Sequence, residues 1–276
     1  MKAAIIEGKR ELVIRDVPEP VLDEDEVLIK VQYCGICGSN LHIYVEGLRM
    51  GFGHELSGDI VKIGANVDGW KIGDRVTYDP DVPCEDGCYW CKRGQVGLCL
   101  NATQVSDTTA GAFATYFKTK GKQLFKLSNR LTYEQGAIVE PTSIALHAVN
   151  MSGIKAGDAV AVLGLGPIGQ LVARVAKLNA RAIYATEISQ SRIELARNVV
   201  DEVANPKVTD AVDRILELTD GLGPDIVFEC AGNVATIQES IALARKGGTI
   251  VVVSNCFDAV ETSFMDIVLK GLTIKG

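Results

Sequence analysis

Four cysteines lie close together in one short segment of the chain. Cys84, Cys88, Cys91 and Cys99 follow the spacing C-x3-C-x2-C-x7-C, and three glycines among them would let the loop wrap round an ion. Four thiolates can surround one tetrahedral zinc ion, and an all-cysteine set leaves no coordination position open. Free buried thiols, a disulfide pair and an iron–sulfur cluster are the alternatives. The spacing predicts a structural zinc site.

A second set of possible ligands is spread over three motifs. They are CGICGSNLH at residues 34–42, GHELSG at residues 53–58 and IVEPTSIALHAV at residues 138–149. A lone histidine is more often a satisfied polar residue than a ligand, so no motif is decisive alone. Together they supply a thiol, an imidazole and carboxylates, and this donor set suits a catalytic zinc that keeps one position open.

A glycine motif of the dinucleotide-binding kind follows the apolar run AVAVL. The sequence GLGPIG at residues 164–169 then leads into an apolar helical pattern. In this context the first glycine allows a tight turn, the second allows close approach of a pyrophosphate, and the third allows helix and strand to pack closely. A glycine-rich turn that binds no nucleotide is the alternative. The residues expected to contact the cofactor are Gly164, Gly166, Pro167, Ile168 and Gly169.

An acidic residue at the end of the next predicted strand strengthens this interpretation. Glu187 lies 18 residues after Gly169 and could accept hydrogen bonds from both ribose hydroxyls. Its charge would repel a 2′-phosphate, which favours NAD over NADP. Arg192 follows five residues later and could soften that preference, so NADP stays open.

The secondary structure expected to position these residues differs between the two halves of the chain. The first half is β-rich, with strands expected at residues 26–32, 56–63, 74–78 and 114–118. In the second half, strands at 159–163, 182–185, 226–229, 249–253 and 272–274 alternate with helical patterns at 169–178, 190–198, 208–218 and 234–244. This alternation predicts a doubly wound parallel sheet, hence an α/β domain after a β domain. The boundary falls between residues 136 and 155.

Composition limits the possible partners and the compartment. The formal net charge is −7, so binding to nucleic acid or to an anionic membrane gains no electrostatic help. The longest uncharged stretch, residues 159–173, is interrupted by glycines and a proline, whereas a transmembrane helix needs about 20 mostly apolar residues. The charged N-terminus does not suit a secretory signal. We expect a cytoplasmic protein whose clustered cysteines bind metal rather than form disulfides.

The chain resembles the zinc-dependent medium-chain dehydrogenases, within them the butanediol, sorbitol and threonine dehydrogenase branch. The likeness runs from MKAAIIEGKRELVIRDVPEP through GHELSGDIVKIGANVDGWKIGDRV to KGGTIVVVSNC and LKGLTIKG, essentially the whole chain. It implies a GroES-like β-barrel catalytic domain over residues 1–140, containing the structural zinc loop 84–99. A Rossmann dinucleotide-binding domain with a doubly wound parallel sheet would occupy residues 141–276.

The resemblance also implies roles for individual residues. Cys37 would be the thiolate ligand of a catalytic zinc and His54 the imidazole ligand. Glu55 and Glu140 fill the two positions from which a carboxylate completes the zinc site, either directly or through a water that it holds. The sequence does not decide which of the two glutamates binds zinc directly. Ser39 and His42 match positions that relay the substrate proton to solvent.

The expected reaction is hydride transfer between NAD(H) and a secondary alcohol, with zinc as the metal cofactor. The substrate expected is a vicinal diol or polyol such as butane-2,3-diol, with threonine as an alternative. Family members imply a homodimer or homotetramer. A catalytically impaired NAD-binding or structural member of the family is the main competing function. A zinc-ribbon interaction module, suggested by the four cysteines alone, conflicts with the −7 charge and the nucleotide motif.

The sequence departs from the family pattern in several places, among them a segment at residues 198–206 that is shorter than usual. Asn40 replaces a usual aspartate that would hold a ligand imidazole by a hydrogen bond, which predicts weaker zinc binding or a slower enzyme. The separation of Cys37 and His54 is several residues shorter than is usual. Family members also continue for several dozen residues beyond the position of Gly276, so the chain is expected to lack the C-terminal segment. If the protein ends there, we do not expect full activity.

Overall fold

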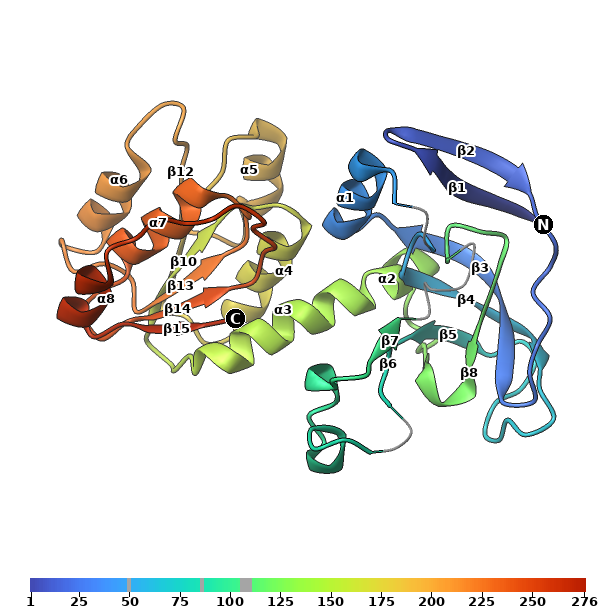
Figure 1. The fold of residues 1–276 in the computed structure, drawn as a ribbon. Helices are drawn as coiled ribbons and strands as arrows, with labels where there is room; N and C mark the ends of the chain where they lie inside the picture. The colour runs from blue at the N-terminus through green and yellow to red at the C-terminus, as the bar shows by residue number, and fades with distance from the viewer. Residues whose placement is uncertain (49–50, 85–86, 105–110) are drawn as a thin grey trace. The chain divides into compact units, whose positions relative to one another are not determined.

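The fold is described by a computed structural model, in which residues 1–48, 51–84, 87–104 and 111–276 are placed well enough to describe. The chain divides into two compact units, Met1–Glu140 and Pro141–Gly276. Over those four ranges no helix combines the length and the hydropathy needed to cross a membrane. Figure 1 shows the elements of both units.

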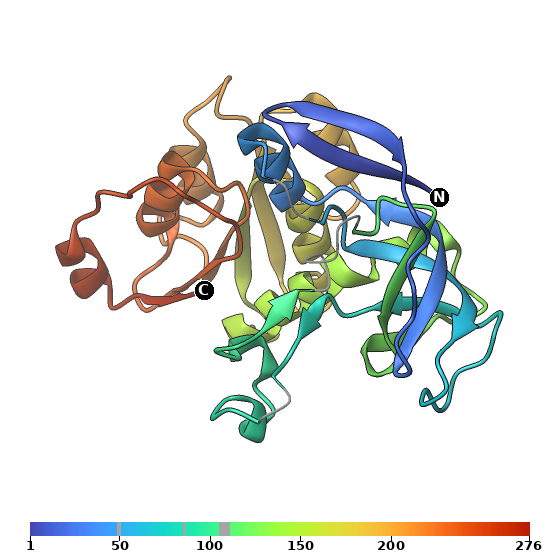
Figure 2. The ribbon, with the colours of Figure 1, turned by 45° about the vertical axis from the view of Figure 1, so that its right-hand side comes forward.

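The first unit is built mainly from antiparallel strands. Its main sheet has the order β8-β3-β4-β5-β9, while β1 pairs with β2 in a hairpin and β6 pairs with β7. The hairpin is the dark blue ribbon of Figure 2. The strands are β1 Lys2–Gly8, β2 Glu11–Asp16, β3 Glu26–Gly35, β4 Glu55–Ile63, β5 Arg75–Tyr78, β6 Asp81–Val82, β7 Thr103–Gln104, β8 Tyr116–Lys120 and β9 Leu124–Lys126.

Helices of the first unit are short and lie at the ends of strands. They are α1 Gly38–Glu46 and α2 Tyr133–Ala137, with 3-10 turns η1 Cys91–Arg93, η2 Val96–Leu98 and η4 Gly121–Gln123. Thr132 and Gln135 begin α2 with a capping box, in which each side chain bonds the other's backbone N–H. The core between the strands is apolar and includes the fully buried Val27, Ile29 and Leu56.

The second unit is a six-stranded parallel sheet of order β12-β11-β10-β13-β14-β15. Strands β11 and β12 therefore lie on one side of β10, and β13, β14 and β15 lie on its other side. Its elements are α3 Val139–Ser152, β10 Ala159–Leu163, α4 Pro167–Ala176, β11 Ala182–Thr186, α5 Gln190–Ala196, β12 Glu202–Ala204, α6 Ala211–Leu218, β13 Ile226–Glu229, α7 Val234–Leu243, β14 Thr249–Val252, α8 Phe264–Lys270 and β15 Thr273–Lys275.

Helices cover both faces of this sheet, which explains the uninterrupted apolar strands. In β10, Val160 and Val162 join a core that includes Val172 of α4. Ala161 and Leu163 face the other way, into a core with Ile215 of α6 and Ile241 of α7. A strand buried on both faces has no polar side, as the sequence AVAVL requires. Figure 1 shows α4 and α5 on one side of the sheet and α6 and α7 on the other.

The strands and helices expected from the sequence are present, with some shifted ends. Helix α6 begins at Ala211, three residues later than expected, because Asp210 caps it by accepting hydrogen bonds from Val212 N and Asp213 N. The predicted strand at 114–118 lies at Tyr116–Lys120, two residues further on. The hairpin β1–β2, helix α1 and the short strand β12 were not among the expected elements.

Candidate metal and dinucleotide sites

Strand pairing brings the CGICGS and GHE motifs together. Gly35, the last residue of β3, lies opposite Glu55, the first residue of β4, in the antiparallel register. A Cβ at Gly35 would overlap Oε2 of Glu55 and lie 3.1 Å from its Cβ, so a larger residue there would require the Glu55 side chain to move. The chain then turns into α1, with Cys37 as its N-cap. Cys37 and Glu55 therefore meet at the end of the sheet although 17 residues separate them in the sequence.

The side chains of Cys37, His54 and Glu55 converge. Their potential ligand atoms, one from each residue, all lie within 4.8 Å of one another. Thiol, imidazole and carboxylate are all donors that zinc accepts, so this set could hold such an ion with a further position left over. Glu140, in the first turn of α3, is half-buried and interacts electrostatically with His54 and Glu55. It is not one of the three residues whose ligand atoms meet within 4.8 Å.

Burial raises the pKa of each acidic group here. Burial raises the pKa of the Glu140 carboxyl to about 7, opposed by the nearby His54 and reinforced by the charge of Glu55. Burial also raises the pKa of Glu55, opposed by His54 and by a hydrogen bond with Cys37. For Cys37 burial again dominates and raises the pKa, although hydrogen bonds from Ser39 favour the thiolate. A cation at this place would relieve all three groups.

Three further residues of α1 follow Cys37 in the chain. Ser39 hydrogen-bonds to the Cys37 sulfur, so its hydroxyl is next to the converging side chains. His42 lies on the same helix and is exposed to solvent. Asn40 is buried, and its Oδ1 accepts the backbone N–H of Cys37 at 3.0 Å. Its Nδ2 has no hydrogen-bond partner in the described part of the chain. The oxygen expected to accept a bond from an imidazole is thus used by the backbone.

The four clustered cysteines form a compact group of sulfur atoms. The Sγ–Sγ distances are 3.8 Å for Cys84–Cys91, 3.7 Å for Cys88–Cys91 and 3.9 Å for Cys88–Cys99. Four sulfurs bound tetrahedrally to zinc at the usual bond length are about 3.8 Å apart. Backbone N–H groups of Cys91 and Leu100 lower the pKa of the Cys88 thiol to about 6. Burial raises the pKa of the neighbouring Cys91 thiol to about 12, so the spacing of the sulfur atoms, rather than the thiol pKa values, fits one tetrahedral zinc.

In the second unit, the glycine motif makes the expected turn between β10 and α4. Gly164 has a φ of +89°, and a Cβ there would lie 2.8 Å from Cβ of Ala231. Gly169 packs so closely that its Cβ would overlap the carbonyl oxygen of Gly164. Gly166 is the N-cap of α4, Pro167 is its first residue and Ile168 its second. The first turn of the helix thus presents backbone N–H groups where a phosphate can bind.

Glu187 follows β11 and reaches back to the glycine turn. Its Oε2 accepts the N–H of Leu165 at 2.9 Å, while Oε1 accepts the N–H groups of Ile188 and Ser189 at 2.8 and 2.9 Å. The guanidinium of Arg192 lies 3.8 Å from Oε2. The carboxylate therefore holds the turn in shape, a role that the sequence did not indicate.

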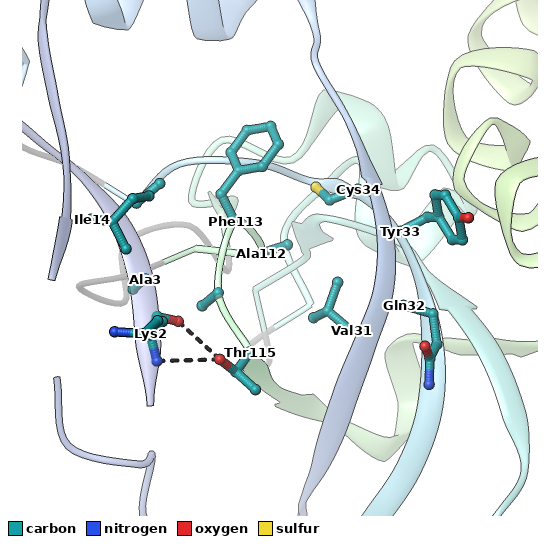
Figure 3. Close-up of a pocket in the computed structure, with 12 residues that line it drawn as sticks. Lys2, Ala3, Ile14, Val31, Gln32, Tyr33, Cys34, Ala112, Phe113 and Thr115 are labelled. Atoms are coloured by element: carbon teal, nitrogen blue, oxygen red, sulfur yellow. Dashed lines mark hydrogen bonds between the residues drawn. The ribbon is translucent and has the colours of Figure 1, made fainter. Parts of the chain in front are cut away.

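A pocket of about 390 Å³ lies elsewhere in the first unit, beside the hairpin β1–β2. Figure 3 shows Ile14 and Phe113 on one side of it and Val31, Cys34 and Tyr33 on the other. None of the three converging side chains lines it. Cys34 lines this pocket and also forms a hydrogen bond with the backbone of Glu55, and burial raises the pKa of its thiol to about 12.

One buried acid was missed by the sequence analysis. Glu229 ends β13 and has no exposed surface. From the sequence, Glu229 was expected only as the last residue of the strand at 226–229. The available signal was its place at the carboxyl end of an apolar strand, as for Glu187.

Comparison with known proteins shows what the two units are similar to. The model of the alcohol dehydrogenase GroES-like domain matches residues 23–129, and that of the zinc-binding dehydrogenases matches residues 167–276. The chain is 36% identical to sorbitol dehydrogenase of Bacillus subtilis (strain 168), covering 92% of this chain and 74% of that protein. It is 37% identical to (R,R)-butanediol dehydrogenase of the same organism, covering 100% of this chain and 84% of the relative.

Solved structures show the same fold. A protein of Sinorhizobium meliloti 1021, assigned to the zinc-binding dehydrogenases and solved with NADP bound, superposes with a TM-score of 0.93 at 34% identity, over 100% of this chain and 83% of that one. The 2R,3R-butanediol dehydrogenase of Bacillus subtilis gives 0.88 at 36% identity, with the same coverage. The parallel sheet is thus a Rossmann fold and the antiparallel unit is GroES-like. With both domains matched and sorbitol and butanediol dehydrogenases as relatives, this chain belongs to the zinc-dependent medium-chain dehydrogenase family, in its alcohol and polyol dehydrogenase class.

Proposed function

We propose that this protein oxidises a secondary alcohol, a vicinal diol or polyol such as butane-2,3-diol, with transfer of a hydride to NAD. The observation that carries the proposal is the convergence of Cys37, His54 and Glu55 within 4.8 Å. In a chain with a dinucleotide turn, such a donor set supports metal-assisted alcohol oxidation. The named sorbitol and butanediol dehydrogenase relatives support the substrate class.

The residues would divide between two metal centres. Cys37 and His54, with Glu55 or Glu140, would hold a catalytic zinc, and Cys84, Cys88, Cys91 and Cys99 would hold a structural one. When bound, zinc supplies Lewis acidity that lowers the pKa of the alcohol, and the nicotinamide supplies the hydride acceptor. The chain's own contribution is to position the alcohol and to remove its proton.

Ser39 and His42 would move that proton. The Ser39 hydroxyl lies against the Cys37 sulfur, where it can accept a proton from an alcohol held beside the ligands and donate its own. The imidazole of His42, one helical turn further along α1 and exposed, can accept a proton and release it to water. This order of groups leads from a half-buried site to solvent.

For the dinucleotide, the turn at Gly164, Gly166 and Gly169 would receive the pyrophosphate at the N-terminus of α4. Pro167 and Ile168 would lie in the first turn beneath it. The charge of Glu187 supports a preference for NAD, and the neighbouring Arg192 would limit how strongly NADP is rejected.

The test is reduction of NAD by the unaltered protein with butane-2,3-diol, sorbitol, xylitol and threonine, with and without a zinc chelator. We expect chelator-sensitive reduction with a diol or polyol, and loss of it in Cys37→Ser. Cys256→Ser is the matched control, because Cys256 belongs to neither cysteine group. If no alcohol gives chelator-sensitive reduction, the catalytically impaired alternative is favoured.

A further inference from the structure

The carboxylate of Glu229 joins three segments at one end of the parallel sheet. It accepts the N–H groups of Ala231 and Gly232, both at 2.9 Å, and the hydroxyl of Thr236 at 2.7 Å. The hydroxyl of Ser254 donates to its other oxygen. These donors belong to the loop after β13, the first turn of α7 and the loop after β14.

The loop that Glu229 holds packs behind the glycine turn. A Cβ at Gly164 would lie 2.8 Å from Cβ and 3.1 Å from N of Ala231. Cys230 N donates to the carbonyl of Leu163 at 2.9 Å, which fixes the loop to the end of β10. A displacement of residues 230–232 would therefore displace the turn. The strand order reverses between β10 and β13, and ligands of open α/β sheets bind at such a reversal.

A carboxylate at this place requires an explanation. The other residues of β13, Ile226, Val227 and Phe228, are apolar and buried, and burying an acid is costly unless it is fully hydrogen-bonded. Glu229 has no exposed surface, so a cofactor cannot touch it directly. Its four donors are instead loop and helix groups that face the crevice end of the sheet.

We propose that Glu229 is a positioning residue for dinucleotide binding. It keeps the loops after β13 and β14 in the conformation that shapes the glycine turn before the cofactor arrives. A binding site that is already ordered does not lose that conformational freedom on binding, so its affinity is higher. The inference rests on the proposed dinucleotide site.

The test compares two acids at opposite ends of the same strand. Asp225 precedes β13 and accepts the N–H of Ala159 at 2.7 Å and the Nε of Arg245 at 2.6 Å. Binding of NADH and of NADPH is measured by fluorescence titration, together with the melting temperature, for Glu229→Ala and Asp225→Ala. Both variants should melt at lower temperature. Only Glu229→Ala should raise the dissociation constant, by about tenfold.

Two more variants separate positioning from general stability. In Glu229→Gln, one oxygen still accepts the two loop N–H groups, and the new amide can donate to Ser254, whose hydroxyl can turn to accept. This variant should bind within about threefold of the unaltered protein. The double variant Thr236→Val, Ser254→Ala removes both hydroxyl donors but leaves the loop N–H bonds. It should show an intermediate loss of affinity, and it replaces Glu229→Ala if that variant does not fold.

The results for the unaltered protein test the dinucleotide site, whereas the results for the variants test the role of Glu229. If the unaltered protein binds neither NADH nor NADPH, the dinucleotide site itself is wrong and the inference is lost with it. If the unaltered protein binds a cofactor but Glu229→Ala binds equally well, only the inference is overturned. The same holds if Asp225→Ala weakens binding as much, because Glu229 would then contribute stability alone.

Discussion

Asn40 has an amide group in a place that suits a carboxylate. Its Oδ1 accepts the Cys37 N–H, whereas its buried Nδ2 has no partner in the described part of the chain. Asn40→Asp would keep the first bond and replace the unsatisfied donor with a second acceptor. The added negative charge would also favour a bound cation. We expect zinc affinity at the Cys37 site to rise by about tenfold, the scale of changes next to metal ligands.

Competition with a chromophoric chelator measures this affinity. Asn40→Ala is the control, because it removes the acceptor of the Cys37 N–H as well and should weaken zinc binding. The metal-free Asn40→Asp protein should melt at lower temperature, since a buried carboxylate without a cation is costly. An unchanged zinc affinity in Asn40→Asp would show that the amide does not limit the site.

The pKa shifts at the site predict how zinc binding depends on pH. Without metal, burial raises the pKa values of Cys37 and Glu55, and that of Glu140 to about 7. Zinc binds the deprotonated forms, so binding must release protons. Affinity at this site should therefore increase from pH 6 to pH 8. Calorimetry in two buffers of different ionisation enthalpy counts the protons released.

Glu140→Gln provides the comparison for this titration. It removes the carboxyl whose pKa lies near 7, and with it the repulsion that Glu140 and Glu55 exert on each other. The pH dependence of zinc affinity should become shallower across pH 6–8. An affinity that does not change with pH in the unaltered protein would mean that the ligands are already deprotonated without metal.

At the scale of elements, the segment that carries the four cysteines has little packing of its own. Neither η1 nor η2 contains a buried residue. Its order should therefore depend on the metal rather than on an apolar core. We expect proteolysis within residues 87–104 to be much faster in Cys91→Ser than in the unaltered protein. Dinucleotide binding should be unchanged, because the glycine turn belongs to the other compact unit.

Limited proteolysis with mapped cleavage sites checks this, with Cys256→Ser as a cysteine variant outside the cluster. Equal protection of residues 87–104 from proteolysis in both variants would show that the segment carrying the four cysteines is stable without four thiolate ligands. A loss of dinucleotide binding in Cys91→Ser would show instead that the two units are energetically coupled.

The elements also show what the sequence could predict. The central parallel strands were predictable because a strand covered on both faces consists of apolar residues alone, as in β10. Helix α1 carries Gly38, Ser39 and Asn40 in its first turn, all weak helix formers, so its propensity did not reveal it. Strand β12 has only three residues. Such a length gives no periodic signal.

For the sites, the residue types were predictable but their hydrogen bonds were not. The meeting of Cys37 with Glu55 depends on the register that pairs Gly35 with Glu55, which is a property of the folded sheet. In the same way, Glu187 was expected at a ribose but also accepts three backbone N–H groups. Backbone partners of a buried acid are set by loop conformation and leave no mark in spacing.

At the scale of the whole molecule, no described strand pairs with the outer edge of β15, and this sheet edge of the second unit is next to an apolar helix surface. Strand β15 is the last in the strand order, and α8 exposes four large apolar residues, Phe264, Met265, Val268 and Leu269. Figure 1 shows α8 and β15 together at the red end of the chain. An open edge beside an apolar surface favours association with another chain. We predict that two copies associate through this surface, which we call the β15–α8 surface.

Sedimentation velocity over a range of concentrations tests this association, with Leu269→Glu as the disrupting variant. A charge at Leu269, within the β15–α8 surface, should raise the dissociation constant by at least about tenfold, as for a residue that contributes much of an interface's binding energy. Leu178→Glu is the matched control, because Leu178 is 81% exposed but lies just after α4, away from this surface. If the unaltered protein is monomeric at all concentrations, or if both variants dissociate alike, the β15–α8 surface is not the interface. Association that survives Leu269→Glu would place the contact elsewhere on the chain.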